Sequence, residues 1–343
     1  MQEGHIMPQQ LGVGIIGVGM LGRQHAINLA HHIPHTRLVA VADVRAETAK
    51  SVATEFGAAS HYTTAEELAA DPDVEAIVIA SADDAHIDGI LAAATNRKDV
   101  FCEKPITTSL ADADTALAAV ADAGVRLQIG FMRQYDKPYL AAKRAIEEGK
   151  IGTPVLFKNA HRGKDPFNIN RPASAGCDPM AFVNSNIHDY NDARWLLADE
   201  AVEVNAAGTR IKDEKSPDGV DAAISTIRFS RGALAAIEFV SATRYGYDVR
   251  TEIVGDRGTL FIGSTQGAPL VIATADGLHQ ESMDHWLVRY GEAYLTELTD
   301  WSRRMLAGEP PLVTGEAGRA ALEIAVAAQR SLAEGRMIQI PLT

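Results

Sequence analysis

Three glycines near the start of the chain have the spacing of residues that bind a dinucleotide. Residues 13–22 read VGIIGVGMLG, so a short apolar stretch runs directly into Gly17, Gly19 and Gly22. In this G-x-G-x-x-G pattern the first glycine permits a tight turn and the second lets the backbone approach a pyrophosphate. The third lets the next helix pack closely on the strand. The helix N-terminus then offers free N–H groups and the positive end of its dipole to the phosphates.

An acidic residue follows at the place where such a site needs one. The next apolar stretch ends in Asp43, about 20 residues beyond the glycines. Together they favour a dinucleotide site over a glycine turn that serves packing alone. A carboxylate accepts the ribose hydroxyls of NAD and repels the 2′-phosphate of NADP, so we expect NAD. Arg45, two residues further on, keeps NADP open as the less favoured cofactor.

A lysine follows another predicted strand on the same side of the sheet. Glu103, Lys104 and Pro105 come directly after the apolar residues 100–102. Pro105 restricts Lys104 to an extended backbone, so its ammonium group can be aimed at one place. A lysine in a closed cleft can hydrogen-bond a substrate hydroxyl and stabilise the alkoxide that forms as hydride leaves. On position alone, a surface lysine in a loop is an equally good interpretation.

Alternating strands and helices position these residues in the first part of the chain. We expect strands at 13–16, 37–43, 75–80, 100–102 and 125–129, and helices at 21–31, 46–56, 65–70, 85–95 and 110–123. Repeated strand–helix units with nearly continuous apolar strands predict a doubly wound parallel sheet of the Rossmann type, covered on both faces. Ligands on such sheets bind at the carboxyl ends of the strands, which adds Ser81 and Glu103 to the residues of interest.

After about Arg133 the pattern changes to longer strands joined by turns. We expect strands at 155–160, 202–211, 222–229, 233–241, 250–254 and 259–262, and helices at 139–149, 184–197, 291–307 and 316–334. Turn-linked strands favour a large, mostly antiparallel sheet in an α+β domain. The chain is therefore expected to divide into a loose tail (1–10), a Rossmann domain (11–132) and an α+β domain (133–343) for substrate binding and oligomerisation.

Composition narrows the classes of partner. The formal net charge of −13 disfavours nucleic acid and anionic membranes. Two cysteines exclude a disulfide scaffold and a four-cysteine zinc site, and they suit the cytoplasm. No apolar run approaches the roughly 18 residues that span a membrane. His31, His32 and His35 cluster without further ligand-type residues, so no metal is expected.

Together these segments resemble the Gfo/Idh/MocA family of NAD(P)-dependent oxidoreductases. In the first half the likeness rests on the glycine motif, Asp43 and residues 103–106. In the second half, residues 149–152 resemble the family's helix-ending segment, and residues 186–196 resemble the helix that carries its catalytic histidine. Residues 245–258 resemble a strand pair of its inositol dehydrogenase branch. The likeness spans roughly residues 11–340 and is much less specific for the substrate than for the family.

The resemblance implies that Lys104 is the active-site lysine and that His188 is the acid/base. Imidazole titrates near neutral pH and suits taking the proton of a secondary alcohol. The chain departs from the family at Asn184, where many sugar and inositol dehydrogenases carry Asp. Residues 184 and 188 should share a helix face, but an amide cannot ionise. Asn191 also stands where the family often has Asp. We do not expect Asp192 to substitute, because one residue turns a side chain by about 100° around a helix.

The expected site residues fall into two groups. The cofactor group is Gly17, Val18, Gly19, Met20, Leu21, Asp43, Val44, Arg45, Ser81, His86, Glu103 and Lys104. The substrate group is Lys104, Arg133, Asp165, Asn184, His188 and Tyr247. For several of them a plainer interpretation stays open: a solvated charged loop for Asp165, strand packing for Tyr247, and a cap or packing role for His86.

These expectations converge on an NAD-dependent dehydrogenase. It would oxidise a secondary ring hydroxyl of a cyclic polyol or sugar, such as an inositol or a monosaccharide, to the ketone by hydride transfer. An anhydrosugar or disaccharide 3-dehydrogenase is the alternative within the family. A non-catalytic NAD-binding sensor or regulatory protein is the alternative from another class. The resemblance also implies a homodimer or homotetramer.

Overall fold

The computed structural model describes residues 10–163, 181–209, 220–241, 243, 245–263 and 266–342. The chain divides into two compact units. The first unit comprises Met1–Phe131 and Tyr294–Arg319, and the second comprises Met132–Ala293 and Ala320–Thr343. The chain thus changes units after Phe131, close to the expected boundary. Residues 294–319 belong to the first unit again. The single boundary that we expected after residue 132 places them in the second domain.

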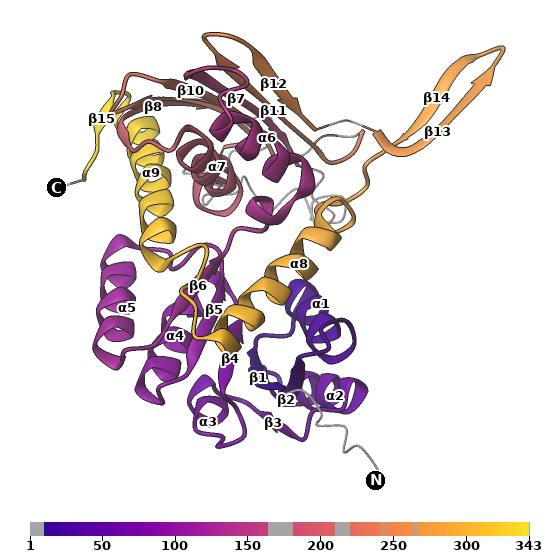
Figure 1. The fold of residues 1–343 in the computed structure, drawn as a ribbon, viewed down its shortest axis with the longest axis vertical. Helices are drawn as coiled ribbons and strands as arrows, with labels where there is room; N and C mark the ends of the chain where they lie inside the picture. Colours follow the sequence, from indigo (N-terminus) through magenta and orange to yellow (C-terminus); the bar gives the residue numbers. More distant parts are fainter. Residues whose placement is uncertain are drawn as a thin grey trace. The chain divides into compact units, whose positions relative to one another are not determined.

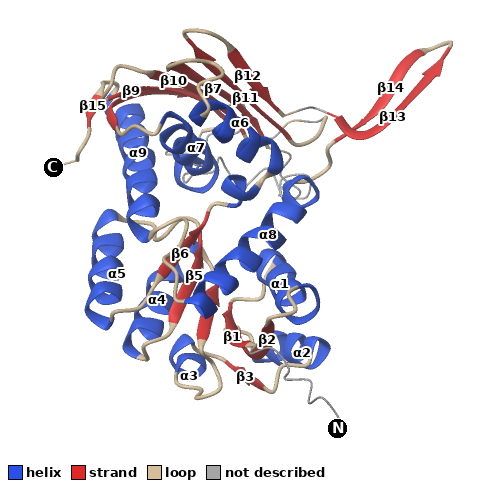
Figure 2. Ribbon diagram, viewed as in Figure 1, coloured by secondary structure: helices blue, strands red, loops and turns tan. Residues whose placement is uncertain are grey.

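The first unit is built on a six-stranded parallel sheet with the order β3-β2-β1-β4-β5-β6 (Figure 1). Its strands are β1 (Leu11–Ile16), β2 (Thr36–Ala42), β3 (Ser60–Tyr62), β4 (Ala76–Ile79), β5 (Asp99–Glu103) and β6 (Leu127–Gly130). The central strands β1 and β4 are buried along their whole length, because helices cover both faces of the sheet (Figure 2). The prediction of a doubly wound parallel sheet is confirmed. The three-residue edge strand β3 was not predicted, because it is too short to show a period.

The helices of the first unit begin and end at residues that suit those positions. They are α1 (Met20–Ile27), which continues as the π-helical η1 (Asn28–His32), then α2 (Ala46–Phe56), α3 (Ala65–Ala69), η2 (Asp83–Ala85), α4 (His86–Thr95) and α5 (Leu110–Ala123). The Ser109 hydroxyl accepts the N–H of Asp112 at 3.1 Å and so caps the start of α5. Gly124 ends this helix in the left-handed conformation, with φ +68°.

The second half of α8 (Trp286–Ala307) belongs to the core of the first unit. Leu298, Trp301 and Met305 pack in the same buried cluster as Val13 and Ile15 of β1. The apolar face of this long helix therefore explains why residues 294–307 group with the Rossmann sheet. The spacing of the apolar residues predicts a helix from the sequence, but it does not indicate the sheet on which the helix packs.

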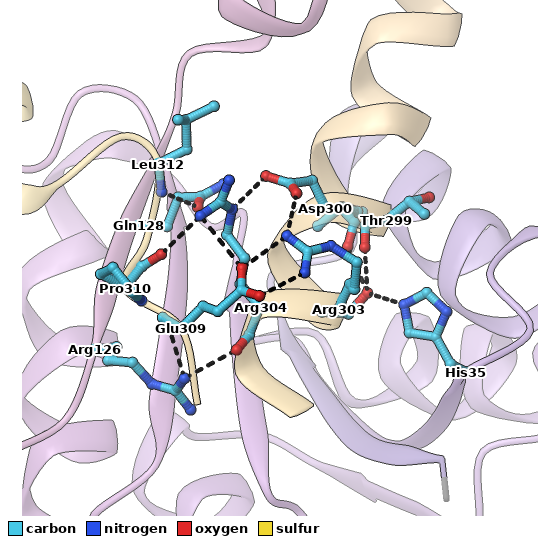
Figure 3. A network of polar contacts seen from close by, with 12 residues as sticks. His35, Arg126, Gln128, Thr299, Asp300, Arg303, Arg304, Glu309, Pro310 and Leu312 are labelled. Atoms are coloured by element: carbon cyan, nitrogen blue, oxygen red, sulfur yellow. Dashed lines mark hydrogen bonds and ion pairs between the residues drawn. The ribbon is translucent and has the colours of Figure 1, made fainter. Parts of the chain in front are cut away.

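A polar network fixes the segment after α8 to the same unit (Figure 3). The Arg126 guanidinium donates from Nη1 to the carbonyls of Arg304 and Glu309, at 3.1 and 3.0 Å. The Gln128 side chain accepts the N–H of Leu312 at 3.2 Å. The carbonyl of Arg304 belongs to the last turn of α8 and has no partner within the helix, so the bond from Arg126 satisfies it. The first residues of α9 (Gly315–Glu334), up to Arg319, also belong to the first unit.

The second unit is built on a seven-stranded sheet with the order β12-β11-β7-β10-β9-β8-β15. Its strands are β7 (Pro154–Arg162), β8 (Ala201–Thr209), β9 (Ala222–Phe229), β10 (Leu234–Val240), β11 (Asp248–Gly255), β12 (Thr259–Ile262) and β15 (Ile338–Gln339). The pair β7–β10 is parallel, and the other neighbouring pairs are antiparallel. The mostly antiparallel sheet that we expected is therefore confirmed. Side chains along β9 alternate between buried and exposed, as one covered face requires.

Helices cover the buried face of this sheet (Figure 2). The helical elements of the second unit are η3 (Met132–Tyr135), α6 (Lys137–Glu147), η5 (Phe182–Asn186), α7 (Ile187–Leu197), the first part of α8 and most of α9 (Gly315–Glu334). The hairpin β13 (Gln266–Thr274) and β14 (Gly277–Ser282), which was not predicted, forms a separate two-stranded sheet. Across the part of the chain that the structure describes, no helix is both long and apolar enough to cross a membrane.

Candidate active site

A cavity of about 670 Å³ opens in the first unit where β1, β2 and β4 end. Eight of the expected cofactor residues line it: Gly17, Gly19, Met20, Leu21, Asp43, Val44, Arg45 and Ser81. The carboxyl ends of neighbouring parallel strands meet at one edge of the sheet, and this is the edge where such folds bind ligands. The structure therefore brings most of the expected cofactor residues together around one cavity.

The three glycines have the geometry that the motif predicts. Gly17 has φ +82°, and a Cβ atom there would lie 2.4 Å from the Cα atom of Ser81. A Cβ atom on Gly22 would lie 2.0 Å from the carbonyl oxygen of Gly17. At Gly19, which precedes α1, a Cβ atom would meet no described atom within 4 Å. The first and third glycines are therefore required by close packing, while the second leaves the space that a pyrophosphate needs at the helix N-terminus.

The Asp43 carboxylate is held in place by its neighbours. Its Oδ2 atom accepts the backbone N–H of Val18 at 3.2 Å, and its Oδ1 atom accepts the N–H and Nε–H of Arg45 at 3.0 and 3.2 Å. Partial burial raises the pKa of Asp43, but the hydrogen bonds from Arg45 and Val18 outweigh it, so the pKa lies below the ordinary value. The group is therefore a fixed anion at the cavity wall and suits ribose hydroxyls.

Replacing Asp43 with asparagine should raise the KM for NAD by about 10- to 100-fold, since a hydrogen bond to a charged group is worth about 1.5–3 kcal/mol. The KM for NADP should rise less or fall, because the change removes the charge that repels a 2′-phosphate and leaves Arg45 in the cavity wall. Steady-state rates with each cofactor measure this preference. Asp88→Asn is the matched control, since Asp88 also lines the cavity. An equal loss of preference in both variants would contradict a specific role for Asp43.

Two of the expected cofactor residues do not line the cavity and instead support Lys104. Glu103 accepts the backbone N–H of Lys104 at 3.3 Å through Oε2. His86 is buried, and its Nδ1 atom lies 2.7 Å from the carbonyl oxygen of Pro105, so Nδ1 carries the donated hydrogen. The Lys104–Pro105 peptide bond is cis. The backbone of the lysine is thus held on both sides, directly after β5. Val18 is also outside the lining, and its contribution is the N–H that it donates to Asp43.

His188 and Asn184 lie in the second unit, on neighbouring helical turns. Asn184 is part of the π-helical turn η5, and His188 is the second residue of α7. The His188 side chain is 7% exposed, while Asn184 is half-buried. Single π-helical turns inside helices are frequent at functional sites. Lys104 belongs to the first unit and His188 to the second, so each residue is described within its own unit.

A buried ionic network fixes α7. Asp189, the residue after His188, accepts Nη1 of Arg133 at 2.5 Å through Oδ1. Its Oδ2 atom lies 2.9 Å from Nδ1 of His161 and also accepts the amide of Asn186 at 2.9 Å. Burial raises the pKa of Asp189, but the charges and hydrogen bonds of His161 and Arg133 outweigh it and lower the pKa. The network therefore anchors the backbone that carries His188.

Arg133 joins this network to a second carboxyl group. Its Nη1 atom also donates to Oδ2 of Asp192 at 2.9 Å, and the arginine and both acids are fully buried. Burial raises the pKa of Asp192 to about 7, although Arg133 opposes the shift. The structure thus gives Arg133 a part in positioning α7, and its expected contact with the substrate remains a prediction. Asp192 points toward Arg133, in keeping with the expectation that it does not replace an acid at position 191.

The remaining expected substrate residues have different outcomes. Tyr247 is 6% exposed, and its ring packs edge-on against the rings of His161 and Tyr290, at 5.9 and 6.2 Å. A substrate contact by Tyr247 therefore remains a prediction. Asp165 lies outside the described residues. His161 lies just beyond the strand that we expected at 155–160 and belongs to β7, because that strand continues to Arg162.

Sequence reasoning missed the part of the cavity wall after β3. Thr63, Thr64 and Glu66 line the cavity there. A signal for this segment exists, since Thr64 accepts the N–H of Glu67 at 3.2 Å while the Glu67 carboxylate accepts the N–H of Thr63 at 3.2 Å. A threonine followed three residues later by glutamate is the capping pattern of a helix start. It marks α3 but does not reveal that the preceding turn faces a ligand.

The first unit has backbone N–H groups at the start of a helix and, at the end of the next strand, a carboxylate that suits ribose hydroxyls. These features define a dinucleotide-binding domain, and a separate α+β domain follows it in the chain. This combination is typical of nicotinamide-dependent oxidoreductases. The family model described as "Oxidoreductase family, NAD-binding Rossmann fold" matches residues 11–131, and the one described as "Oxidoreductase family, C-terminal alpha/beta domain" matches residues 143–341. The chain belongs to the Gfo/Idh/MocA family and is an NAD-dependent oxidoreductase.

Several characterised proteins are similar to the chain over its whole length. It is 34% identical to myo-inositol 2-dehydrogenase of Thermotoga maritima, covering 96% of this chain and 98% of that protein. It is also 34% identical to the NAD(+)-dependent scyllo-inositol 2-dehydrogenase of Bacillus subtilis, covering 97% of each. The crystal structure of myo-inositol dehydrogenase from Lactobacillus casei with NAD(H) and myo-inositol has a TM-score of 0.89 and 27% identity, covering 98% of each chain.

Proposed function

We propose that this enzyme oxidises a secondary ring hydroxyl of a cyclic polyol, first of all an inositol, to the ketone. The names of its relatives support this substrate class. The observation that carries the proposal is the position of Lys104. It follows β5, the neighbour of β4, and Ala80 and Ser81 after β4 line the cofactor cavity. A lysine there lies at the sheet edge where the nicotinamide end of a dinucleotide is expected.

In this proposal each residue has a distinct task. The Lys104 ammonium group hydrogen-bonds the reacting oxygen and stabilises the alkoxide as the hydride leaves. His188 takes the hydroxyl proton as general base. NAD bound in the cofactor cavity would supply the acceptor for the hydride that leaves the carbon. Asn184 orients the ring by hydrogen bonding, with Arg133, Asp165 and Tyr247 as further proposed contacts. The proposed division of the chain assigns residues 11–132 to the cofactor and residues 133–343 to the substrate.

The test is NADH formation with NAD or NADP across inositols, monosaccharides, anhydrosugars and disaccharides. We expect turnover of an inositol with NAD and a ketone as product. Turnover confined to anhydrosugars or disaccharides would replace this proposal with the 3-dehydrogenase alternative, which the uncharged Asn184 favours. Binding of NAD with no turnover of any member of the panel would contradict the proposal and support a sensor.

We also infer a cytoplasmic homodimer or homotetramer. The exposed face of the seven-stranded sheet supports the assembly. By register, Ile224 on β9, Leu234 on β10 and Phe261 on β12 share this face, and their exposed fractions are 54%, 42% and 78%. Large apolar side chains along one open sheet face are typical of an interface between subunits.

A further inference from the structure

A fully buried carboxyl group in the first unit has no role in the reaction as described so far. Glu297, on α8, has 0% exposure, and neither of its side-chain oxygens has a hydrogen-bond partner among the residues that the structure describes. Leaving a buried carboxylate without a partner is costly, and an ionised one is costlier still. A carboxyl group in such a position is therefore either retained for a function or held in its neutral form.

The neighbours of Glu297 on α8 show what it faces. Tyr294 precedes it by three residues and Trp301 follows it by four, so the three side chains share one face of the helix. The ring of Tyr294 lies 5.8 Å from that of His25, on α1, and the ring of Trp301 lies 5.8 Å from that of Phe101, on β5. Glu297 therefore lies on the face of α8 that carries these two aromatic contacts with α1 and β5.

A second acid is held at the same place. His25 is fully buried, and its Nε2 atom lies 2.7 Å from Oε1 of Glu103. The other oxygen of Glu103 accepts the N–H of Lys104. A Cβ atom on Gly130, the partner of Glu103 in β6, would lie 3.0 Å from the Glu103 carboxyl carbon, so glycine makes room for the acid. Glu103 thus connects a buried histidine to the backbone of Lys104.

The two acids differ in what stabilises their charge. Glu103 has the His25 ring and the N–H of Lys104. Glu297 has no such partner among the described residues, and burial together with the negative charge of Glu103 raises its pKa well above the ordinary value. Of the described ionisable side chains, Glu103 from β5 acts on the charge of Glu297. Tyr294 shares its face of α8 and contacts the ring of His25 from α1. Burial beside Glu103 thus favours the neutral form of Glu297.

We propose that Glu297 is a positioning residue that acts through Glu103 and must stay neutral for Lys104 to be held in place. A neutral Glu297 leaves the Glu103 carboxylate free to accept the Lys104 N–H. Ionisation of Glu297 puts a second negative charge beside Glu103 in a space without water, and the repulsion displaces Glu103 from that N–H. The consequence for turnover rests on the proposed role of Lys104, whereas the protonation state of Glu297 does not.

The first test measures thermal unfolding of wild type and Glu297→Gln from pH 4.5 to 8. At pH 4.5 the glutamate is protonated in the folded chain and about half protonated in the unfolded chain. As pH rises, the unfolded chain releases a proton that the folded chain keeps, so wild-type stability falls. Glutamine has no such proton. We expect the Tm of the variant to rise relative to wild type across this range, by a few degrees.

The matched control is Glu292→Gln, since Glu292 lies on the same helix but is exposed and paired with Lys137. Its Tm difference from wild type should not grow with pH in favour of the variant. A difference for Glu297→Gln that is constant from pH 4.5 to 8 would show that Glu297 ionises normally, and the proposal would be overturned.

The second test follows the backbone amide signal of Lys104 by NMR as pH is raised. We expect a transition at alkaline pH in wild type that is absent in Glu297→Gln, and a decline of kcat over the same range that is also absent in the variant. An identical Lys104 titration in both proteins would overturn the positioning role. If wild type turns over no substrate, the proposed function fails, but the unfolding and NMR results still decide the state and role of Glu297.

Discussion

Replacing Lys104 with methionine is expected to lower kcat by about 10²- to 10³-fold, as removal of one oxyanion-type donor does. Methionine keeps the length and apolar stem of the side chain but cannot hydrogen-bond or stabilise an alkoxide. Binding of NAD should change little, because Lys104 is not among the residues that line the cofactor cavity. Steady-state NADH formation gives kcat, and fluorescence titration gives the Kd for NAD.

The matched control is Lys137→Met, since Lys137 is an exposed lysine whose side chain is 77% accessible. It should keep wild-type kcat. A kcat for Lys104→Met within about fivefold of wild type would contradict the proposed role, because electrostatic stabilisation by a single donor is worth more than that. A large increase in the Kd for NAD with unchanged kcat would instead make Lys104 a cofactor residue.

The cofactor half of the site could be predicted because its signals are local. Gly17, Gly19 and Gly22 lie within a stretch of six residues, and their roles follow from backbone geometry rather than from distant partners. Asp43 ends the next strand, so its place at the sheet edge follows from the order of the elements. In contrast, no local pattern shows that the turn at Thr63 faces the same cavity, since β3 has only three residues.

The ionic network on α7 could not be predicted, because its members are far apart in the sequence. Arg133 and its partners Asp189 and Asp192 are separated by 56 and 59 residues. The sequence shows an arginine after a strand end, where a substrate contact is a reasonable interpretation. The fold buries the guanidinium and gives it two carboxyl groups as partners, as an arginine at such a depth requires. Glu297 is a similar case, since a glutamate in an amphipathic helix usually indicates the exposed face.

Each of the two proposed catalytic residues has a chain neighbour that is held by hydrogen bonds. Glu103 precedes Lys104 and fixes its N–H, and His86 fixes the carbonyl of the residue after it. Asp189 follows His188 and accepts hydrogen bonds from three side chains. We expect this support to hold the backbones of the lysine and the histidine in position. It also predicts that changes at these supporting residues reduce kcat by disturbing position.

Replacing His188 with glutamine is expected to lower kcat by about 10²- to 10⁴-fold, the usual contribution of a general base. Glutamine keeps a hydrogen-bonding side chain but cannot take the proton. In wild type the rate should fall at acid pH, because a protonated imidazole cannot act as base, and the residual rate of the variant should lack this decline. Rate profiles against pH measure both effects. A decline that persists in the variant would point to another base and would contradict the role proposed for His188.

The companion variant Asn184→Asp tests the position at which the chain departs from its family. Residue 184 should share a helix face with His188, so a carboxylate there places a negative charge near the imidazole. Such a charge stabilises the imidazolium and raises the pKa of the histidine. The acid decline of the rate should therefore move to higher pH, while the rate at alkaline pH stays close to wild type. A profile that does not move would mean that residue 184 does not face His188, and the orienting role proposed for Asn184 would have to be given up.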